Sequence, residues 1–191
     1  MGRSGPMGAL NLPNCLTVGR MCLTPALVIL LSGDAWGPAL GVFMAAMATD
    51  ALDGYLARSR GAITDFGRLM DPIADKLLIG AAFVCLAAID RVDPWAVAVI
   101  LAREAAVSGL RLAARRQGVV ISANRLGKAK TVVQSVAIVV LIAVGDPQAA
   151  WVQALVGVTV GITVVSGLAY VVSYYGGRRA PVATAPVSPA G

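Results

Sequence analysis

The run AAWVQALVGVTVGITVVSGLAYVVSY at residues 149–174 contains no acidic or basic residue. A transmembrane helix needs about 20 mostly apolar residues to cross a bilayer, and this run is long enough. Five further apolar stretches precede it, at residues 14–32, 36–57, 72–90, 94–114 and 130–146. The fifth stretch is the shortest, and we expect its helix to extend into the polar residues before it. The pattern predicts an all-α, polytopic integral membrane protein with six transmembrane helices.

The composition supports this fold class and excludes several kinds of chemistry. Of 191 residues, 58% are hydrophobic and 14% are charged, whereas about a quarter of a typical soluble domain is charged. The chain contains no histidine, which excludes Ser-His-Asp and Cys-His catalysis and histidine zinc sites. Its three cysteines form no C-x-x-C pair, which argues against a thiolate zinc site and against a disulfide framework.

Charges alternate between the two sides of the predicted spans. Acidic residues dominate the connections after the first, third and fifth spans, and most basic residues lie on the other side. The positive-inside rule places the basic side, and with it both termini, in the cytoplasm. The net charge of +6 then indicates anionic lipid or an anionic substrate as partner, and no nucleic acid.

Six spans account for most of the chain, so we expect one domain with two short flanking segments. Residues 1–13 are expected to form an N-terminal interfacial segment. Residues 14–176 form the six-helix domain, and the Pro- and Ala-rich residues 177–191 form a disordered cytoplasmic tail.

Four aspartates at helical spacing carry the most specific signal. Asp50 and Asp53 end the second span, and Asp71 and Asp75 begin the third. Spacings of three and four residues place each pair on one face of its helix. Because a short loop joins the two spans, the faces are expected to meet at the cytoplasmic edge of the bilayer. The alternative is that these acids form helix-end salt bridges with Arg58, Arg68 and Lys76.

Four clustered carboxylates need positive charge to offset them. Oxygen ligands without histidine or cysteine favour Mg²⁺ or Mn²⁺ over zinc. Two such metals per site are a standard arrangement for displacement at phosphorus. The small residues Gly54, Ala57 and Gly67 are expected to let a substrate approach the backbone beside the metals.

The segment resembles the signature D-x2-D-G-x2-A-R-x8-G-x3-D-x3-D of the CDP-alcohol phosphatidyltransferases. All eight positions are met, by Asp50, Asp53, Gly54, Ala57, Arg58, Gly67, Asp71 and Asp75. Further segments, at residues 11–20, 71–77, 103–111 and 127–134, are similar to the phosphatidylglycerophosphate synthase branch of that family.

The resemblance implies a homodimeric enzyme of the bacterial cytoplasmic (inner) membrane, with its site open to the cytoplasm. It would transfer a phosphatidyl group from CDP-diacylglycerol to sn-glycerol 3-phosphate and release CMP. By the family pattern, Asp50 and Asp71 contact both metals, Asp53 contacts one and Asp75 the other. Asp75 is also the implied catalytic base for the attacking hydroxyl.

The substrate contacts fall into two groups. The resemblance also implies contacts to CDP-diacylglycerol, which we expect from Pro13, Asn14, Thr17, Gly54, Ala57, Arg58, Thr64 and Gly67. An acceptor phosphate needs its own cations, and we expect Arg103, Arg111, Lys128 and Lys130 to supply them. Glu104, the only glutamate of the chain, would orient one of the arginines. Arg115, Arg116 and Arg125 are interpreted as a belt that contacts lipid phosphates.

Three other functions remain open at this point. A CDP-alcohol-type cardiolipin synthase would use phosphatidylglycerol as acceptor and would need fewer acceptor cations. An inositol phosphate is a third acceptor, although the sequence at residues 71–76 is less similar to that branch. A small cation transporter would place acids near the midplane of several helices, whereas here they cluster on two helices at one edge.

Overall fold

The computed structural model describes residues 12–60, 65–116 and 125–177, with side chains for 19–49, 74, 76–114, 116, 127 and 129–175. The described ranges form helices joined by short connections and contain no strand, which confirms the all-α class. The helices are α1 (Leu12–Ser32), α2 (Trp36–Arg60), α3 (Asp65–Ala88), α4 (Pro94–Arg116), α5 (Arg125–Ala143) and α6 (Ala150–Gly177).

The helix bounds extend the apolar stretches into their polar flanks. α3 begins seven residues before the expected start at residue 72, and α5 begins at Arg125 instead of residue 130. Hydropathy marks the part of a helix that can lie in hydrocarbon, whereas the backbone hydrogen bonds of a helix continue through polar turns. The expectation that the fifth helix extends into its polar N-terminal flank is therefore confirmed.

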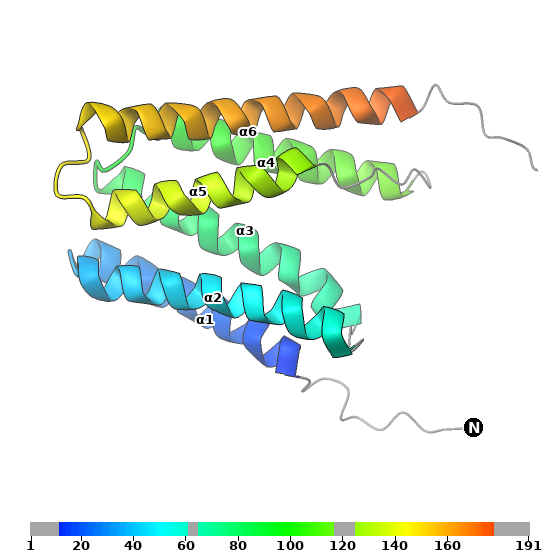
Figure 1. Ribbon diagram of the computed structural model, residues 1–191, viewed down its shortest axis with the longest axis horizontal. Coiled ribbons are helices and arrows are strands. Elements are labelled where there is room, and N and C mark those ends of the chain that lie inside the picture. Colours follow the sequence, from blue (N-terminus) through cyan, green and yellow to red (C-terminus); the bar gives the residue numbers. More distant parts are fainter. Residues whose placement is uncertain (1–11, 61–64, 117–124, 178–191) are drawn as a thin grey trace, which may run out of the picture.

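Successive helices run in alternating directions and form two groups of three (Figure 1). α1 packs against α2 and α3, and α6 packs against α4 and α5. Contacts of α3 with α4 and α5, and of α2 with α5, join the two groups. The N-terminal end of α1 and the C-terminal end of α6 therefore lie at the same end of the bundle, and three tight turns lie at the other end.

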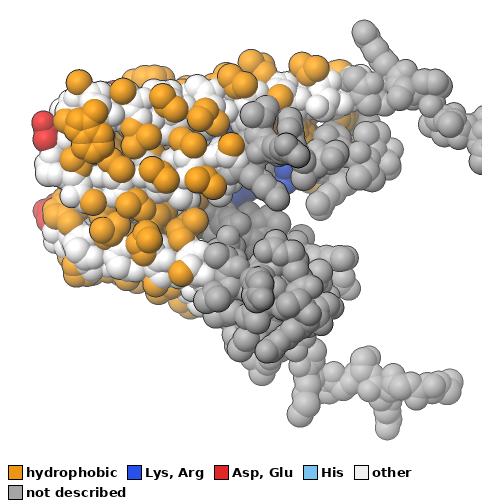
Figure 2. Space-filling view, viewed as in Figure 1, with side chains coloured by type: hydrophobic (Ala, Val, Ile, Leu, Met, Phe, Trp, Pro, Cys, Tyr) orange, Lys and Arg blue, Asp and Glu red, His pale blue; other side chains and the backbone are white. Residues whose placement is uncertain are grey.

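Apolar side chains fill the interior and also cover the outside. Phe43, Phe83 and Leu86 are among the fully buried residues of a core that draws on all six helices. Figure 2 shows apolar side chains over most of the described surface in view. One described helix segment, Ala150–Tyr175, is long and apolar enough to cross a membrane, and four shorter apolar helix segments of 10–17 residues accompany it.

Two aspartates end helices at the turn end of the bundle. Asp34 and Asp90 have φ angles of 55° and 56°, in the left-handed region. The N–H of Ala35 donates to the Leu30 carbonyl at 2.9 Å, and the N–H of Arg91 donates to the Leu86 carbonyl at 2.8 Å. This pattern is the Schellman motif, in which a left-handed residue lets the next N–H reach back over the last helical turn. Aspartate tolerates that conformation better than most residues.

Arg91 is the one basic residue in the described turns at this end of the bundle. Its side chain caps the C-terminal end of α5. Its Nε donates to the carbonyl of Leu141 at 2.8 Å, and its Nη2 donates to the carbonyl of Val144. The guanidinium carbon lies 4.3 Å from the ring centroid of Trp36. Burial lowers the pKa of Arg91, and the charge of Asp34 offsets part of that shift. Arg91 thus ties the α3–α4 turn to the end of α5 and the start of α2.

Replacing Arg91 by alanine is expected to lower the stability of the bundle without changing the residues at its opposite end. The change leaves two carbonyls at the α5 terminus without their donors and removes a cation–π contact. We expect a loss of about 2 kcal/mol and a fall of about 6 °C in the thermal midpoint, measured by circular dichroism in detergent. Arg116→Ala, at the exposed end of α4, is the control and should shift the midpoint by less than about 2 °C. Equal midpoints for both variants would contradict the capping role.

Candidate active site

The predicted metal ligands lie on two helices, near the end of the bundle opposite the tight turns (Figure 1). Asp50 and Asp53 belong to the C-terminal half of α2, and Asp71 and Asp75 belong to the N-terminal half of α3. Because both segments are helical, the spacings of three and four residues place each pair on one side of its helix. The four side chains lie outside the described residues, so their grouping around a metal stays a prediction.

The predicted CDP-diacylglycerol contacts fall on the first three helices. Pro13, Asn14 and Thr17 belong to α1, Gly54, Ala57 and Arg58 to α2, and Gly67 to α3. Their side-chain environment, and Thr64 as a whole, lie outside the described residues. The described side chains contain no group of three potential metal ligands, but the four aspartates are not among them.

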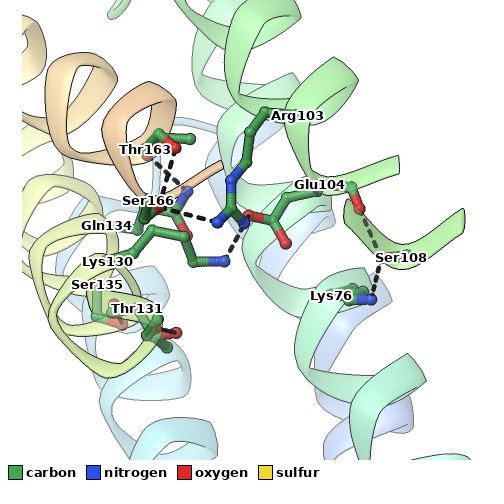
Figure 3. Close-up of polar contacts among 11 residues, drawn as sticks. Lys76, Arg103, Glu104, Ser108, Lys130, Thr131, Gln134, Ser135, Thr163 and Ser166 are labelled. Atoms are coloured by element: carbon green, nitrogen blue, oxygen red, sulfur yellow. Dashed lines mark hydrogen bonds and ion pairs between the residues drawn. The ribbon is translucent and has the colours of Figure 1, made fainter. Parts of the chain in front are cut away.

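The described part of the site is centred on Glu104. One carboxylate oxygen of Glu104 accepts hydrogen bonds from Arg103 Nη1, at 2.9 Å, and from Lys130 Nζ (Figure 3). The three side chains are only 11–17% exposed. The prediction that Glu104 orients an arginine is confirmed, and the structure adds that the same oxygen holds Lys130. Two of the four predicted acceptor cations are therefore brought together by one carboxylate.

A third cation reaches this cluster from α3. Lys76 Nζ donates to Ser108 Oγ, and Ser108 Oγ donates to the backbone carbonyl of Glu104 at 2.5 Å. Figure 3 shows Lys76 and Ser108 beside Glu104. Lys76 immediately follows Asp75, so the cluster adjoins the predicted metal ligands along the chain. We name Lys76, Arg103, Glu104 and Lys130 the cation cluster.

Buried polar groups of α5 and α6 form the wall behind the cation cluster. Ser166 Oγ accepts a hydrogen bond from Arg103 Nη2 at 2.8 Å. Gln134 Nε2 donates to Thr163 Oγ1 at 3.3 Å, and both residues are at most 1% exposed. Buried polar groups are costly unless they are hydrogen-bonded. These contacts therefore supply hydrogen-bond partners to the buried polar groups of this wall.

The other two residues predicted to bind the acceptor, Arg111 and Lys128, have no described contact with the Glu104 carboxylate. Arg111 is exposed, and its guanidinium carbon lies 5.6 Å from the ring centroid of Tyr170. No contact between Arg111 and Glu104 occurs among the described interactions. Lys128 lies in α5, but its side chain is outside the described residues. The role of both as acceptor ligands stays a prediction.

The cation cluster holds three cations against one carboxylate. Arg103, Lys130 and Glu104 are largely buried, whereas Lys76 is exposed at the edge of the cluster. An excess of positive charge at low dielectric attracts an anion strongly, and a phosphate monoester carries about two negative charges. Arginine can offer paired N–H groups to phosphate oxygens, and lysine adds a point charge. The arrangement is therefore suited to binding a phosphate group at the end of the bundle that carries the aspartates.

The sequence analysis missed the contributions of Lys76, Ser166 and Tyr170 to this region, whereas Gln134 was already expected beside Lys128 and Lys130. Lys76 had been weighed only as a salt-bridge partner for the aspartates. The available signal for α6 was weak, because Thr163 and Ser166 are small polar residues within an apolar helix. Such residues commonly bond to their own backbone, and only the packing of α6 against α4 shows that Ser166 also meets Arg103.

Comparison of the sequence with known proteins assigns the chain to a family. Residues 10–172 match the CDP-alcohol phosphatidyltransferase family. The CDP-diacylglycerol–glycerol-3-phosphate 3-phosphatidyltransferase of Bacillus subtilis is 40% identical over 147 residues, covering 69% of this chain and 76% of that protein. A probable phosphatidylglycerophosphate synthase of Mycobacterium tuberculosis is 38% identical over 168 residues, covering 84% of this chain and 80% of that protein. The family match spans most of the chain and all eight signature positions, and the chain belongs to the CDP-alcohol phosphatidyltransferase family.

Proposed function

We propose that the protein transfers the phosphatidyl group of CDP-diacylglycerol to sn-glycerol 3-phosphate, forming phosphatidylglycerophosphate and CMP. Relatives about 40% identical over most of the chain bear the name of that activity. The observation that carries the choice of acceptor is the cation cluster, in which Glu104 holds Arg103 and Lys130 together. Its excess positive charge matches a small acceptor that brings a phosphate monoester of its own.

The donor set fits two divalent cations. Asp50, Asp53, Asp71 and Asp75 would hold them, and carboxylate oxygens without histidine or cysteine suit Mg²⁺ or Mn²⁺. When bound, the cations would neutralise charge on the pyrophosphate and on the departing CMP. The helical backbone at all four positions and their location on two successive helices support this assignment.

The protein's own groups account for the remaining chemistry. The acceptor hydroxyl attacks the phosphorus that carries diacylglycerol, the bond from that phosphorus to CMP breaks, and CMP leaves. Asp75 takes the proton from the attacking hydroxyl, since an alcohol is a weak nucleophile at neutral pH. Arg58, Gly54, Ala57, Thr64 and Gly67 would line the CDP-diacylglycerol headgroup site.

The acceptor is held by its phosphate while its hydroxyl reacts. Arg103 and Lys130 would contact the phosphate directly, with Arg111 and Lys128 as further candidates at the cytoplasmic end of the same helices. Holding the acceptor at a second point orients its hydroxyl toward the donor, which raises the rate by removing motions that the reaction would otherwise have to restrict.

We infer that all six helices lie in the cytoplasmic membrane of a bacterium, with both termini and the active site on the cytoplasmic side. The apolar outer surface, and the concentration of lysine and arginine around the connections that follow α2 and α4, support this orientation. We also propose that the protein forms a homodimer, because the resemblance to the family implies one. The predicted interfacial segment at residues 1–13 and the tail at residues 177–191 fall almost entirely outside the described residues.

Measuring CMP release separates the proposed acceptor from its alternatives. Purified protein in detergent is given CDP-diacylglycerol and Mg²⁺, with glycerol 3-phosphate, phosphatidylglycerol or an inositol phosphate. We expect turnover with glycerol 3-phosphate only, and none after a chelator removes divalent cations. Preference for phosphatidylglycerol would instead identify a cardiolipin synthase. Absence of CMP release with every acceptor would overturn the transferase assignment.

A further inference from the structure

One face of α6 lies along the two arginines of α4. Thr163, Ser166, Gly167 and Tyr170 are spaced by three, one and three residues, and such spacing places them on one side of a helix. We call these four residues the α6 strip. None of them belongs to the eight-position signature or to the four flanking segments, so nothing in those motifs assigns them a role.

Ser166 presents an oriented hydroxyl oxygen to Arg103. Its hydroxyl donates to the backbone carbonyl of Thr163 at 2.9 Å, which commits its proton to the helix. The oxygen therefore faces Arg103 as an acceptor, and it receives Nη2 at 2.8 Å. Ser166 is 5% exposed, so water does not compete effectively for this contact.

Gly167 supplies the space in which the Arg103 side chain lies. A Cβ atom added at Gly167 would lie 3.0 Å from Cγ of Arg103 and 3.1 Å from its Nε. These distances are shorter than ordinary van der Waals contact, so a side chain at this position requires the arginine to shift by a few tenths of an ångström. Nε of Arg103 is buried and has no hydrogen-bond partner among the described residues. The side chain is thus clamped along α6, and Glu104 holds Nη1 from the opposite side.

The same face continues to the second arginine. Tyr170 lies one turn beyond Ser166, and the guanidinium carbon of Arg111 lies 5.6 Å from its ring centroid. Arg103 and Arg111 are eight residues apart on α4, while Ser166 and Tyr170 are four apart on α6. The α6 strip therefore contacts both arginines that are predicted to bind acceptor.

We infer that Ser166 and Gly167 are positioning residues that set the affinity for the acceptor phosphate by holding the Arg103 guanidinium. A guanidinium has five N–H groups in a rigid fork. With one N–H of Nη1 on Glu104 and one of Nη2 on Ser166, the terminal N–H groups that remain have a defined direction. The inference rests on the proposed function, because it assumes that Arg103 binds the phosphate of the acceptor.

The test compares two serines of the same helix. Ser166→Ala removes the acceptor for Arg103, whereas Ser173→Ala removes an exposed hydroxyl that donates only to the Ala169 carbonyl at 2.9 Å. For Ser166→Ala we expect KM for glycerol 3-phosphate to rise about tenfold. Its kcat, and its KM for CDP-diacylglycerol, should change less than about twofold. Ser173→Ala should match the wild type, and Ser166→Thr, which keeps the hydroxyl, should recover most of the affinity.

A second variant and a double-mutant cycle test whether the effect acts through Arg103. Gly167→Ala should raise KM for glycerol 3-phosphate by about tenfold or more, because the added methyl displaces the arginine. In an Arg103→Gln background, neither Ser166→Ala nor Gly167→Ala should raise KM further by more than about twofold. Full additivity of the effects would overturn the inference.

The outcomes separate this inference from the function on which it rests. If the wild type releases no CMP with glycerol 3-phosphate, the proposed acceptor falls and this inference falls with it. If the wild type uses glycerol 3-phosphate but Ser166→Ala and Ser173→Ala have the same KM, the inference alone is wrong. An equal rise in KM for both substrates in Ser166→Ala would show a general structural effect and would also overturn it.

Discussion

Asp75→Asn is expected to lower the rate of CMP release by at least about a thousandfold. Asparagine has nearly the size of aspartate, but it carries no charge and cannot take a proton from the attacking hydroxyl. A positioned general base contributes about a hundredfold to ten-thousandfold, and a lost metal ligand adds to the effect. The measurement is the initial rate of CMP release at saturating CDP-diacylglycerol and glycerol 3-phosphate.

Asp90→Asn is the matched control for this change. Asp90 lies at the opposite end of the bundle, in the left-handed conformation that ends α3, and asparagine also tolerates that conformation. We expect activity within about twofold of the wild type and unchanged helix content for both variants. Activity of Asp75→Asn within tenfold of the wild type would contradict the base assignment. Recovery of the rate at high Mg²⁺ would indicate that Asp75 acts as a ligand and not as the base.

Arg103→Gln is expected to raise KM for glycerol 3-phosphate by about a hundredfold, or about 2.7 kcal/mol. Arg103 is one of the two cations that Glu104 holds together, and its side chain is 13% exposed. A charge-assisted hydrogen bond in such a water-poor place is worth more than one at the surface. Arg103→Lys keeps the charge, but one ammonium group cannot reproduce the fork that spans Glu104 and Ser166. Its KM should therefore lie between those of the wild type and Arg103→Gln.

Arg116→Gln removes the same charge from the same helix, at its exposed end. We interpret Arg116 as part of the belt that contacts lipid phosphates, so KM for glycerol 3-phosphate should stay within about twofold of the wild type. KM for CDP-diacylglycerol should be unchanged in both variants. If Arg103→Gln and Arg116→Gln raise KM equally, the effect comes from net charge, and Arg103 does not contact the acceptor phosphate.

The positions of the helices follow from local features of the chain. Apolar stretches separated by short polar connections predicted six helices, and the structure places a helix at each of them. The spacings of Asp50 and Asp53, and of Asp71 and Asp75, depend only on helical geometry. The adjacency of Arg103 and Glu104 was likewise visible in the sequence. These features depend on interactions over a few residues, which an isolated sequence displays directly.

The partners across helices were decided by tertiary packing. Lys130 meets Glu104 from 26 residues away, and Ser166 meets Arg103 from 63 residues away. Arg91 reaches the end of α5 across 50 residues or more. Helices that are apolar on every side carry no stripe to show which face meets a neighbour. The sequence alone thus determined the helices, the aspartate pairs and the family, whereas only the packing of α4, α5 and α6 decided which side chains share Glu104 and Ser166.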